Sequence, residues 1–378
     1  MVSSGPLTVS RLPPRWLGPL AVLVALSSFP GDHAISPLRL WGLEDASRGP
    51  LDRRHLALVI NAADPLSESI GRVYQRARRL PDTQVIRVRF EPAVSSLDPA
   101  SFRVLKGEVD RRTPRHVQVY ALAWAAPYRV GCQSITSAFA FGIDSRLCAE
   151  GCRPTRVNPY YARGDVRRPW DALRMRPAML LAATRLSEAH GLIARGVASD
   201  GTAPPGTAYL LSTSDGKRNS RAFSYGRVAA AVGEGFRVKV LRSDSLVGAK
   251  DVMAYFTGLA TVPAMASNRY RPGAVADHLT SFGGQLTDSQ QMSALRWLEA
   301  GATGSYGTVV EPCNFPAKFP DPALVLAYYR RGDTLIEAYW RSVAMPGQGV
   351  FIGEPLARPW PARLSGSVDV DARPRHAR

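Results

Sequence analysis

The segment at residues 272–312, PGAVADHLTSFGGQLTDSQQMSALRWLEAGATGSYGTVVEP, decides the fold class of this chain. Residues 273–276 (GAVA) are small and apolar, which is typical of a strand buried on both faces. Residues 302–310 form a second apolar run, and the pattern between the two runs is helical. A strand, a helix and a strand in this order are the repeating unit of a parallel sheet.

The helix in this segment is predicted from its start signal, its spacing and its stop signal. Thr287 with Gln290 matches a capping box. Apolar residues follow at helical spacing over 292–298, and Gly301 supplies the stop.

The alternation of strand and helix continues through most of the chain. Residues 55–61 (HLALVIN) predict a first buried strand, and Asp64 followed by Pro65 predicts the start of a helix. Further strands are predicted at 84–90, 116–123, 207–213, 236–241 and 251–256, and further helices at 101–111, 178–194, 221–232 and after Asp321 and Thr334. We therefore predict an α/β fold, a three-layer sandwich with a mainly parallel sheet.

Both ends of the chain differ from its middle. Positive charges precede an apolar core at 16–29 that is too short for a comfortable transmembrane span, so residues 1–30 predict a secretory signal peptide, with an uncleaved anchor as the alternative. Residues 31–54 predict a linker and residues 361–378 a disordered tail. We expect one domain at 55–360, periplasmic or secreted, with no stable membrane span once the signal is removed.

The charge of the chain is strongly basic. The formal net charge is +17, and only five of the 48 basic residues are lysines. The arginines are scattered rather than gathered into a stripe, so we predict no nucleic-acid partner. Positive charge favours attraction to an anionic polysaccharide or to a membrane surface. We expect exopolysaccharide or surface proteins as partners.

Residues 129–175 interrupt the pattern and hold three of the four cysteines, Cys132, Cys148 and Cys152. We predict an insertion beside the sheet. Since no histidine lies among the three, a disulfide is favoured over a metal site, and we expect at least one disulfide within the trio. The spacing leaves the pairing open.

Reactive side chains follow two neighbouring predicted strands. Asp277 and His278 come after the first, and Glu311 and Cys313 after the second. Paired carboxylates serve general acid–base catalysis, and a thiol near an imidazole serves nucleophilic catalysis, so these four are the catalytic candidates. The alternatives are that the acids cap turns and that Cys313 joins a disulfide.

Five further residues are candidates for binding: Asn61, Asp64, Ser281, Gly283 and Gly284. The glycine pair predicts a tight turn, and we expect all five to share one sheet edge with the catalytic candidates, since ligands bind at the carboxyl edge of open α/β sheets. The chain has no Walker loop, Rossmann glycine triplet or zinc motif, so we predict no cofactor and no metal.

Several phrases together resemble a family of secreted bacterial proteins that accompanies the exosortase sorting system. They are VINAAD (59–64) with Ser67, Tyr74, Arg78 and Pro81, then PGAVAD (272–277), LTSFGG (279–284), GATGSYGTVVEP (301–312), KFP (318–320), GDTLIEA (332–338), PGQ (346–348) and GEPLA (353–357). The resemblance implies an exported protein of a bacterium that makes exopolysaccharide and sorts surface proteins, and it implies no activity.

A looser similarity links GDTLIEA and the Gly-acidic-Pro turn after it to gingipain-like cysteine peptidases, which have a caspase-like fold. In those enzymes one strand ends in His-Gly and the next in the nucleophilic Cys. The corresponding strand ends here are Thr257–Gly258 and Ala276–Asp277, so the catalytic pair is not carried over.

The predicted sheet is therefore caspase-like or flavodoxin-like, and two functions remain open. One is a hydrolase-like enzyme on a caspase-like scaffold with altered catalytic residues. The other is a non-catalytic binding or accessory protein for exopolysaccharide or for surface-protein sorting. Convergent carboxylates in a deep cleft would favour the enzyme, and a groove of arginine and aromatic side chains the binding protein.

Overall fold

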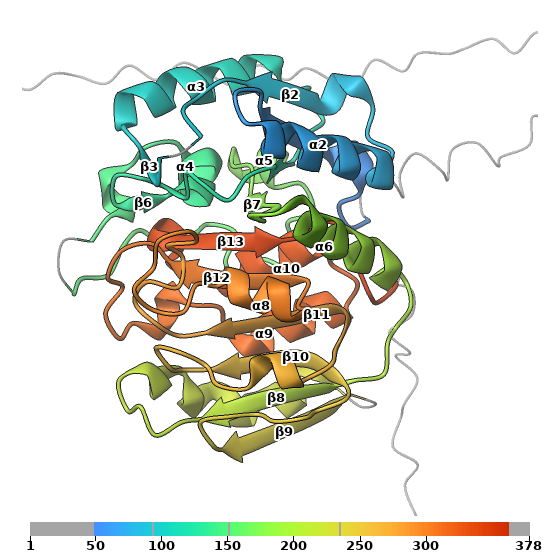
Figure 1. The fold of residues 1–378 in the computed structure, drawn as a ribbon, viewed down its shortest axis with the longest axis vertical. Helices are drawn as coiled ribbons and strands as arrows, with labels where there is room; N and C mark the ends of the chain where they lie inside the picture. The colour runs from blue at the N-terminus through green and yellow to red at the C-terminus, as the bar shows by residue number, and fades with distance from the viewer. Residues whose placement is uncertain (1–48, 93, 150–151, 234–235, 363–378) are drawn as a thin grey trace, which may run out of the picture. The chain divides into compact units, whose positions relative to one another are not determined.

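A computed structural model describes residues 49–92, 94–149, 152–233 and 236–362 of this chain. The predicted signal peptide, most of the predicted linker and nearly all of the predicted tail lie outside the described residues. The described chain folds around a ten-stranded, mostly parallel sheet flanked by helices, as Figure 1 shows. The predicted three-layer α/β sandwich is confirmed.

The sheet consists of two halves that run in opposite directions. From one edge to the other its strands are β2 (Val85–Val88), β1 (Leu56–Asn61), β4 (Val119–Leu122), β7 (Ala178–Leu180), β13 (Gly349–Gly353), β12 (Gly304–Thr308), β11 (Tyr270–His278), β10 (Val252–Thr257), β8 (Thr207–Ser212) and β9 (Arg237–Arg242). Neighbours are parallel except β12 and β13, which are antiparallel. The carboxyl ends of the two halves therefore lie at opposite edges of the sheet.

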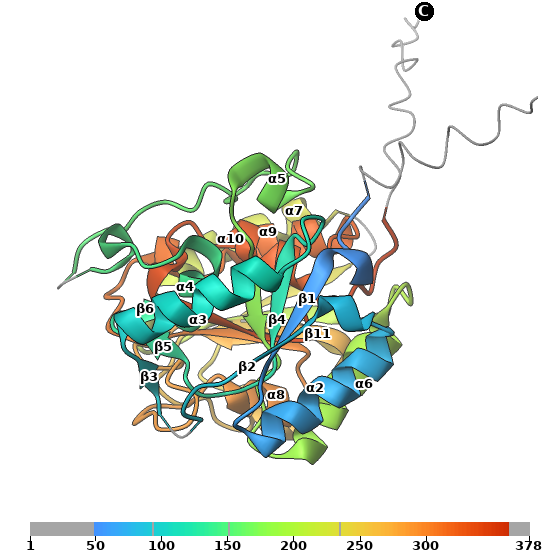
Figure 2. The ribbon, with the colours of Figure 1, turned by 90° about the horizontal axis from the view of Figure 1, so that it is seen from above.

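Helices cover both faces because successive strand residues point to opposite sides. On β1, Leu58 and Ile60 belong to the cluster that contains the apolar side of α2, whereas Ala57 and Val59 pack in the cluster of α3. The helices are α2 (Pro65–Arg78), α3 (Pro99–Arg112), α4 (Ile135–Phe141), α5 (Pro169–Leu173), α6 (Leu186–Ser199), α7 (Val228–Val232), α8 (Leu295–Ala300), α9 (Pro322–Arg330) and α10 (Leu335–Ser342). Figure 2 shows α2 and α6 side by side.

Shorter elements complete the fold. A small second sheet is formed by β3 (Ser96–Leu97), β5 (Arg129–Val130) and β6 (Gln133–Ser134). Single turns of 3₁₀ helix are η2 (Arg53–His55), η3 (Asp82–Gln84), η4 (Ser145–Leu147), η6 (Met265–Ser267), η7 (Pro316–Lys318) and η8 (Pro346–Gln348), and a longer one, η5 (Arg218–Arg227), leads into α7. No helix in the described segments is long and apolar enough to cross a bilayer.

Two predicted helices begin later than the sequence indicates. The predicted helix at 178–194 contains β7 and then α6, because residues 178–180 are buried between β4 and β13 and a short apolar run fits a strand as well as a helix. The capping box at Thr287 is also wrong, since α8 starts only at Leu295. The residues between Thr287 and Leu295 are not helical. One of them, Met292, donates its N–H to the carbonyl of Ala260 in another loop.

The domain includes segments that the sequence placed outside its core. Leu51, in the predicted linker, is buried, and its N–H donates to Glu337 Oε2. Residues 129–175 contain α4, whose Ile135, Ala138 and Phe139 are buried beneath β7 and β13. These segments lack a clear period because their burial depends on tertiary contacts.

Two disulfides hold the described cysteines. Cys132 pairs with Cys148, which confirms the predicted disulfide within the trio. Cys152 pairs with Cys313 across 161 residues of sequence. Two disulfides are typical of a protein from an oxidising compartment.

Candidate functional site

A cleft of about 640 Å³ lies at the carboxyl edge of the second half of the sheet. Its walls come from segments that follow three strands, β8, β11 and β12, and from Cys152 in the segment before α5. The lining residues are Cys152, Lys217, Arg218, Leu279, Thr280, Ser281, Glu311, Pro312, Cys313, Asn314 and Phe315. The cleft thus contains the predicted candidates Ser281, Glu311 and Cys313, at the edge where open α/β sheets bind ligands.

Asn61 and Asp64 lie at the other edge, so the prediction that they share the cleft is wrong. They follow β1, which belongs to the half that runs opposite to β11 and β12. The reversal between β12 and β13 is invisible in the local sequence. It separates these two residues from the other candidates.

Structural contacts account for both residues. Asn61 Nδ2 donates to the Phe90 carbonyl at 3.0 Å, and its Oδ1 accepts the N–H of Ala63 and of Phe90. These bonds join the ends of β1 and β2. Asp64 Oδ1 accepts the Leu66 N–H at 2.8 Å, as an N-cap of α2 does.

Asp277 is buried and does not line the cleft. Its Oδ1 lies 2.5 Å from Nη2 of Arg221, and the two residues are 1% and 2% exposed. Neither carboxylate oxygen accepts a backbone amide in the described chain, so the turn-capping alternative is wrong for this residue. Burial raises the pKa of Asp277 to about 6, against the opposing effect of the Arg221 guanidinium. Its structural role is to balance a buried positive charge.

His278 is a core histidine. Its Nδ1 accepts the indole N–H of Trp297 at 2.9 Å, and since an indole nitrogen only donates, the ring proton must be on Nε2. Nε2 then donates to the Met292 carbonyl at 3.0 Å. Burial lowers the pKa of His278 to about 4. Both nitrogens are occupied, so this ring is unsuited to act as a base in the cleft.

Cys313 and Glu311 line the cleft without forming a catalytic pair. Cys313 is bonded to Cys152, so it presents no thiol and the predicted Cys313–His278 dyad is wrong. Glu311 is exposed, and its Oε1 accepts the Cys313 N–H at 2.8 Å. Glu311 therefore caps the turn that carries the disulfide, while its carboxylate stays open to the cleft.

Ser281 faces the cleft, and the glycine pair packs behind it. Neither Gly283 nor Gly284 has a positive φ, so the prediction of a turn that needs glycine is wrong. Glycine is needed at 284 because the backbone there lies close to that of Gly307. A Cβ on Gly284 would be 2.4 Å from the Gly307 carbonyl oxygen. The pair lets the loop after β11 lie against β12.

The cleft is also lined by three residues that are not among the predicted site residues: Lys217, Arg218 and Phe315. The first two follow β8, and Arg218 donates from Nε to Thr280 Oγ1 at 3.1 Å and pairs with Asp215. The polar turn after the predicted strand at 207–213 was the signal that could have found them. Once that strand is parallel to the one at 273–276, its turn must lie at the same edge.

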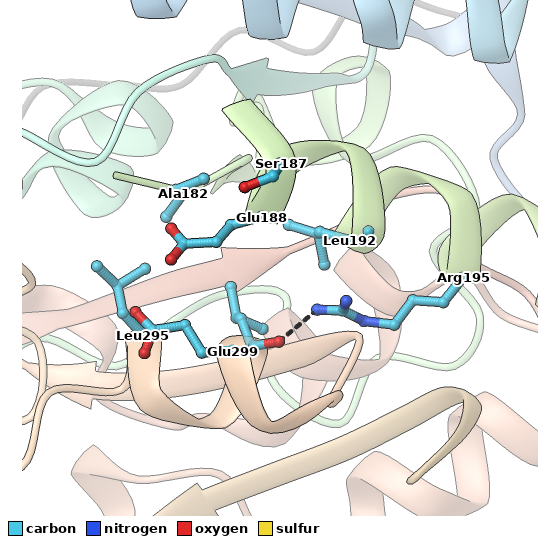
Figure 3. Close-up of a pocket in the computed structure, with 10 residues that line it drawn as sticks. Ala182, Ser187, Glu188, Leu192, Arg195, Leu295 and Glu299 are labelled. Carbon is cyan, nitrogen blue, oxygen red and sulfur yellow. Dashed lines mark hydrogen bonds between the residues drawn. The ribbon is translucent and has the colours of Figure 1, made fainter. Parts of the chain in front are cut away.

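A second groove of about 230 Å³ lies between α6 and α8 (Figure 3). Arg195 reaches across it and donates to the carbonyls of Ala302 and Leu298, and burial lowers the pKa of this guanidinium to about 10. Glu188 caps the start of α6, and burial raises the pKa of Glu299. Arg195 thus connects α6 to the end of α8, while each of the two acids is bonded within its own helix or that helix's first turn.

Comparisons with known proteins add little to this geometry. No protein-family model matches the chain, and no curated protein matches it. A solved structure titled "Structure of Protease" aligns with 84% of this chain and 81% of that chain, at 11% identity and a TM-score of 0.40. A likeness at this level carries no inference about function.

The arrangement suits binding better than covalent chemistry. Nucleophilic catalysis needs a nucleophile within reach of a base, and the cleft presents a disulfide and a capping carboxylate where the sequence predicted such a pair. Two cationic side chains, an aromatic ring and small polar groups line the remainder. Side chains of these kinds bind an anionic, hydroxyl-rich ligand.

Proposed function

We propose that this chain is an exported binding protein whose cleft at the carboxyl edge of β8, β11 and β12 holds an anionic polysaccharide. The observation that carries the proposal is the composition of the cleft: Lys217, Arg218 and Phe315 are grouped there with Ser281 and Asn314. Cys313 is in a disulfide and His278 is in the core, so these two residues supply neither a free thiol nor an accessible imidazole for a peptidase-like reaction.

Export is supported by the signal-like segment at 16–29 and by the two disulfides. The sequence resemblance to an exosortase-associated family supports a place at the surface of a bacterium that makes exopolysaccharide. The weaker resemblance to gingipain-like peptidases supports a caspase-like scaffold that has lost its catalytic pair. In this proposal the chain is an accessory protein, not a hydrolase.

Binding of defined polysaccharides to the purified mature protein tests the proposal. We expect dextran sulfate or oligogalacturonate to bind saturably and less tightly at high salt, and neutral dextran not to bind. Lys217→Glu should weaken binding, whereas Arg111→Glu, the same charge change on an exposed position of α3, should not. Equal binding of neutral dextran would contradict the proposal.

The same samples test the enzymatic alternative. We expect no release of reducing ends from either anionic polymer and no labelling of the non-reduced protein by thiol-reactive probes. Polymer cleavage that depends on Glu311 would replace the binding proposal with a glycoside hydrolase.

A further inference from the structure

Lys318 is a buried cation beside the cleft. It ends η7 and is 0% exposed, and its Nζ has no hydrogen-bond partner and no ion pair among the described residues. Other buried cations in this fold are paired: Arg221 with Asp277 and Arg341 with Asp333. An unpaired buried ammonium is destabilising, so its presence calls for an explanation.

The position of Lys318 connects it to the cleft. Its Nζ lies 5.0 Å from the centroid of the Phe315 ring, and Phe315 lines the cleft. Among the described residues, the carboxylate of Glu311, which also lines the cleft, acts on the ammonium electrostatically and opposes the effect of burial on its pKa. Burial lowers the pKa of Lys318 to about 8, so the amine is still mainly protonated at neutral pH. The positive charge of Lys318 therefore lies behind Phe315 in the wall of the cleft.

We propose that Lys318 is a concealed anion-binding residue of the cleft, reached when the Phe315 side chain turns aside. Its ammonium then pairs with one anionic group of a bound sugar polymer, a carboxylate or a sulfate ester. This inference rests on the proposed binding function. A charge-assisted hydrogen bond replaces the weaker contact with the ring and removes the cost of the unpaired charge.

Lysine suits this role because a compact ammonium on a flexible stem can reach a single anionic group. The backbone of Lys318 makes two hydrogen bonds that do not involve its side chain. Its carbonyl accepts from the Tyr306 hydroxyl at 2.6 Å, and its N–H donates to the Phe315 carbonyl. A side-chain substitution leaves both bonds in place. Charge and local fold can thus be tested separately.

Calorimetric titration of the mature protein and Lys318→Met tests the proposal. The probes are oligogalacturonate, its methyl ester, which is neutral, and dextran sulfate. We expect Lys318→Met to weaken binding of the anionic probe by about tenfold or more, and to melt at the same or a higher temperature than the wild type. Lys250→Met, an exposed lysine outside the cleft, is the matched control.

The outcomes separate the inference from the function on which it rests. If neither anionic probe binds the wild type, the proposed function fails. If an anionic probe binds and Lys318→Met binds equally well, only the present inference fails. The probe that loses more affinity on this substitution identifies the group, carboxylate or sulfate.

A second measurement covers the case in which Lys318→Met folds poorly. With five lysines in the chain, each Nζ is resolvable by NMR after lysine labelling. We expect the pKa of Lys318 to rise when the anionic probe saturates the wild type. We also expect Lys318 to be acetylated faster in Phe315→Ala than in the wild type, as measured by mass spectrometry of the digested protein. An unchanged pKa at saturation would overturn the proposal.

Discussion

Arg221 and Asp277 form an ion pair in the interior, with 2.5 Å between Nη2 and Oδ1. The pair joins η5 to the end of β11, and Arg221 also donates to the carbonyls of Thr257 and Pro320. One guanidinium thus fastens the ends of β10 and β11 and the segment after η7 to each other. The acid that the sequence marked as catalytic acts as the counter-ion of this junction.

Asp277→Asn should therefore be strongly destabilising. Removing one charge leaves Arg221 buried and unpaired, and we expect a loss of about 3–5 kcal/mol in the free energy of unfolding. Urea denaturation measures it. Asp165→Asn, which breaks the exposed pair with Arg163, should cost less than about 1 kcal/mol. Adding Arg221→Met to Asp277→Asn should recover part of the loss, and no recovery would contradict the counter-ion role.

His278 should make the fold sensitive to acid. Its folded-state pKa of about 4 lies below the ordinary 6.5, so its stability contribution is complete above pH 6.5 and is lost as the pH falls towards 4.

Comparison with His278→Gln isolates the histidine contribution. The stability advantage of the wild type over this variant should shrink by up to about 3 kcal/mol between pH 6.5 and pH 4. Denaturant melts at several pH values measure it. Parallel stability curves for the two proteins would show that the ring is not buried in the neutral form.

The long-range disulfide should stabilise the fold more than the short-range one. Cys152–Cys313 closes 161 residues and Cys132–Cys148 closes 16. In the chain-entropy account, Cys152→Ser with Cys313→Ser should cost about 2 kcal/mol more than Cys132→Ser with Cys148→Ser. Chemical denaturation of the two double variants provides the comparison. Four reactive thiols in the denatured, non-reduced wild type would refute both disulfides.

Gly307→Ala should disturb the wall beside the cleft. The new Cβ would lie 2.4 Å from the backbone of Gly283 and of Gly284, so the loop after β11 must move. We expect a loss of about 1–3 kcal/mol, read from thermal melts. Gly107→Ala is the control: it lies in α3 with no close neighbour, and it should stabilise by roughly 0.5–1 kcal/mol. Equal effects would contradict the close packing.

Local sequence identified most of the elements but misjudged where they meet. The strand at 55–61 and the helix started by Asp64 are predictable because hydrophobic period and capping act over a few residues. The strand β7 was missed because three buried residues carry no period. Ser281 and Glu311 were placed at the cleft because consecutive parallel strands end at the same edge.

The sequence by itself determined the fold class, the carboxyl edge of β11 and β12 and a disulfide within the cysteine trio, since each follows from neighbours along the chain. Only the tertiary structure decided that β12 and β13 are antiparallel, which puts Asn61 at the other edge. It also decided that Cys313 joins Cys152, and that the Lys318 ammonium is buried with no hydrogen-bond partner in the part of the chain that the structure describes. These facts depend on contacts between distant segments, and no local pattern of hydrophobicity or charge encodes which segments will meet.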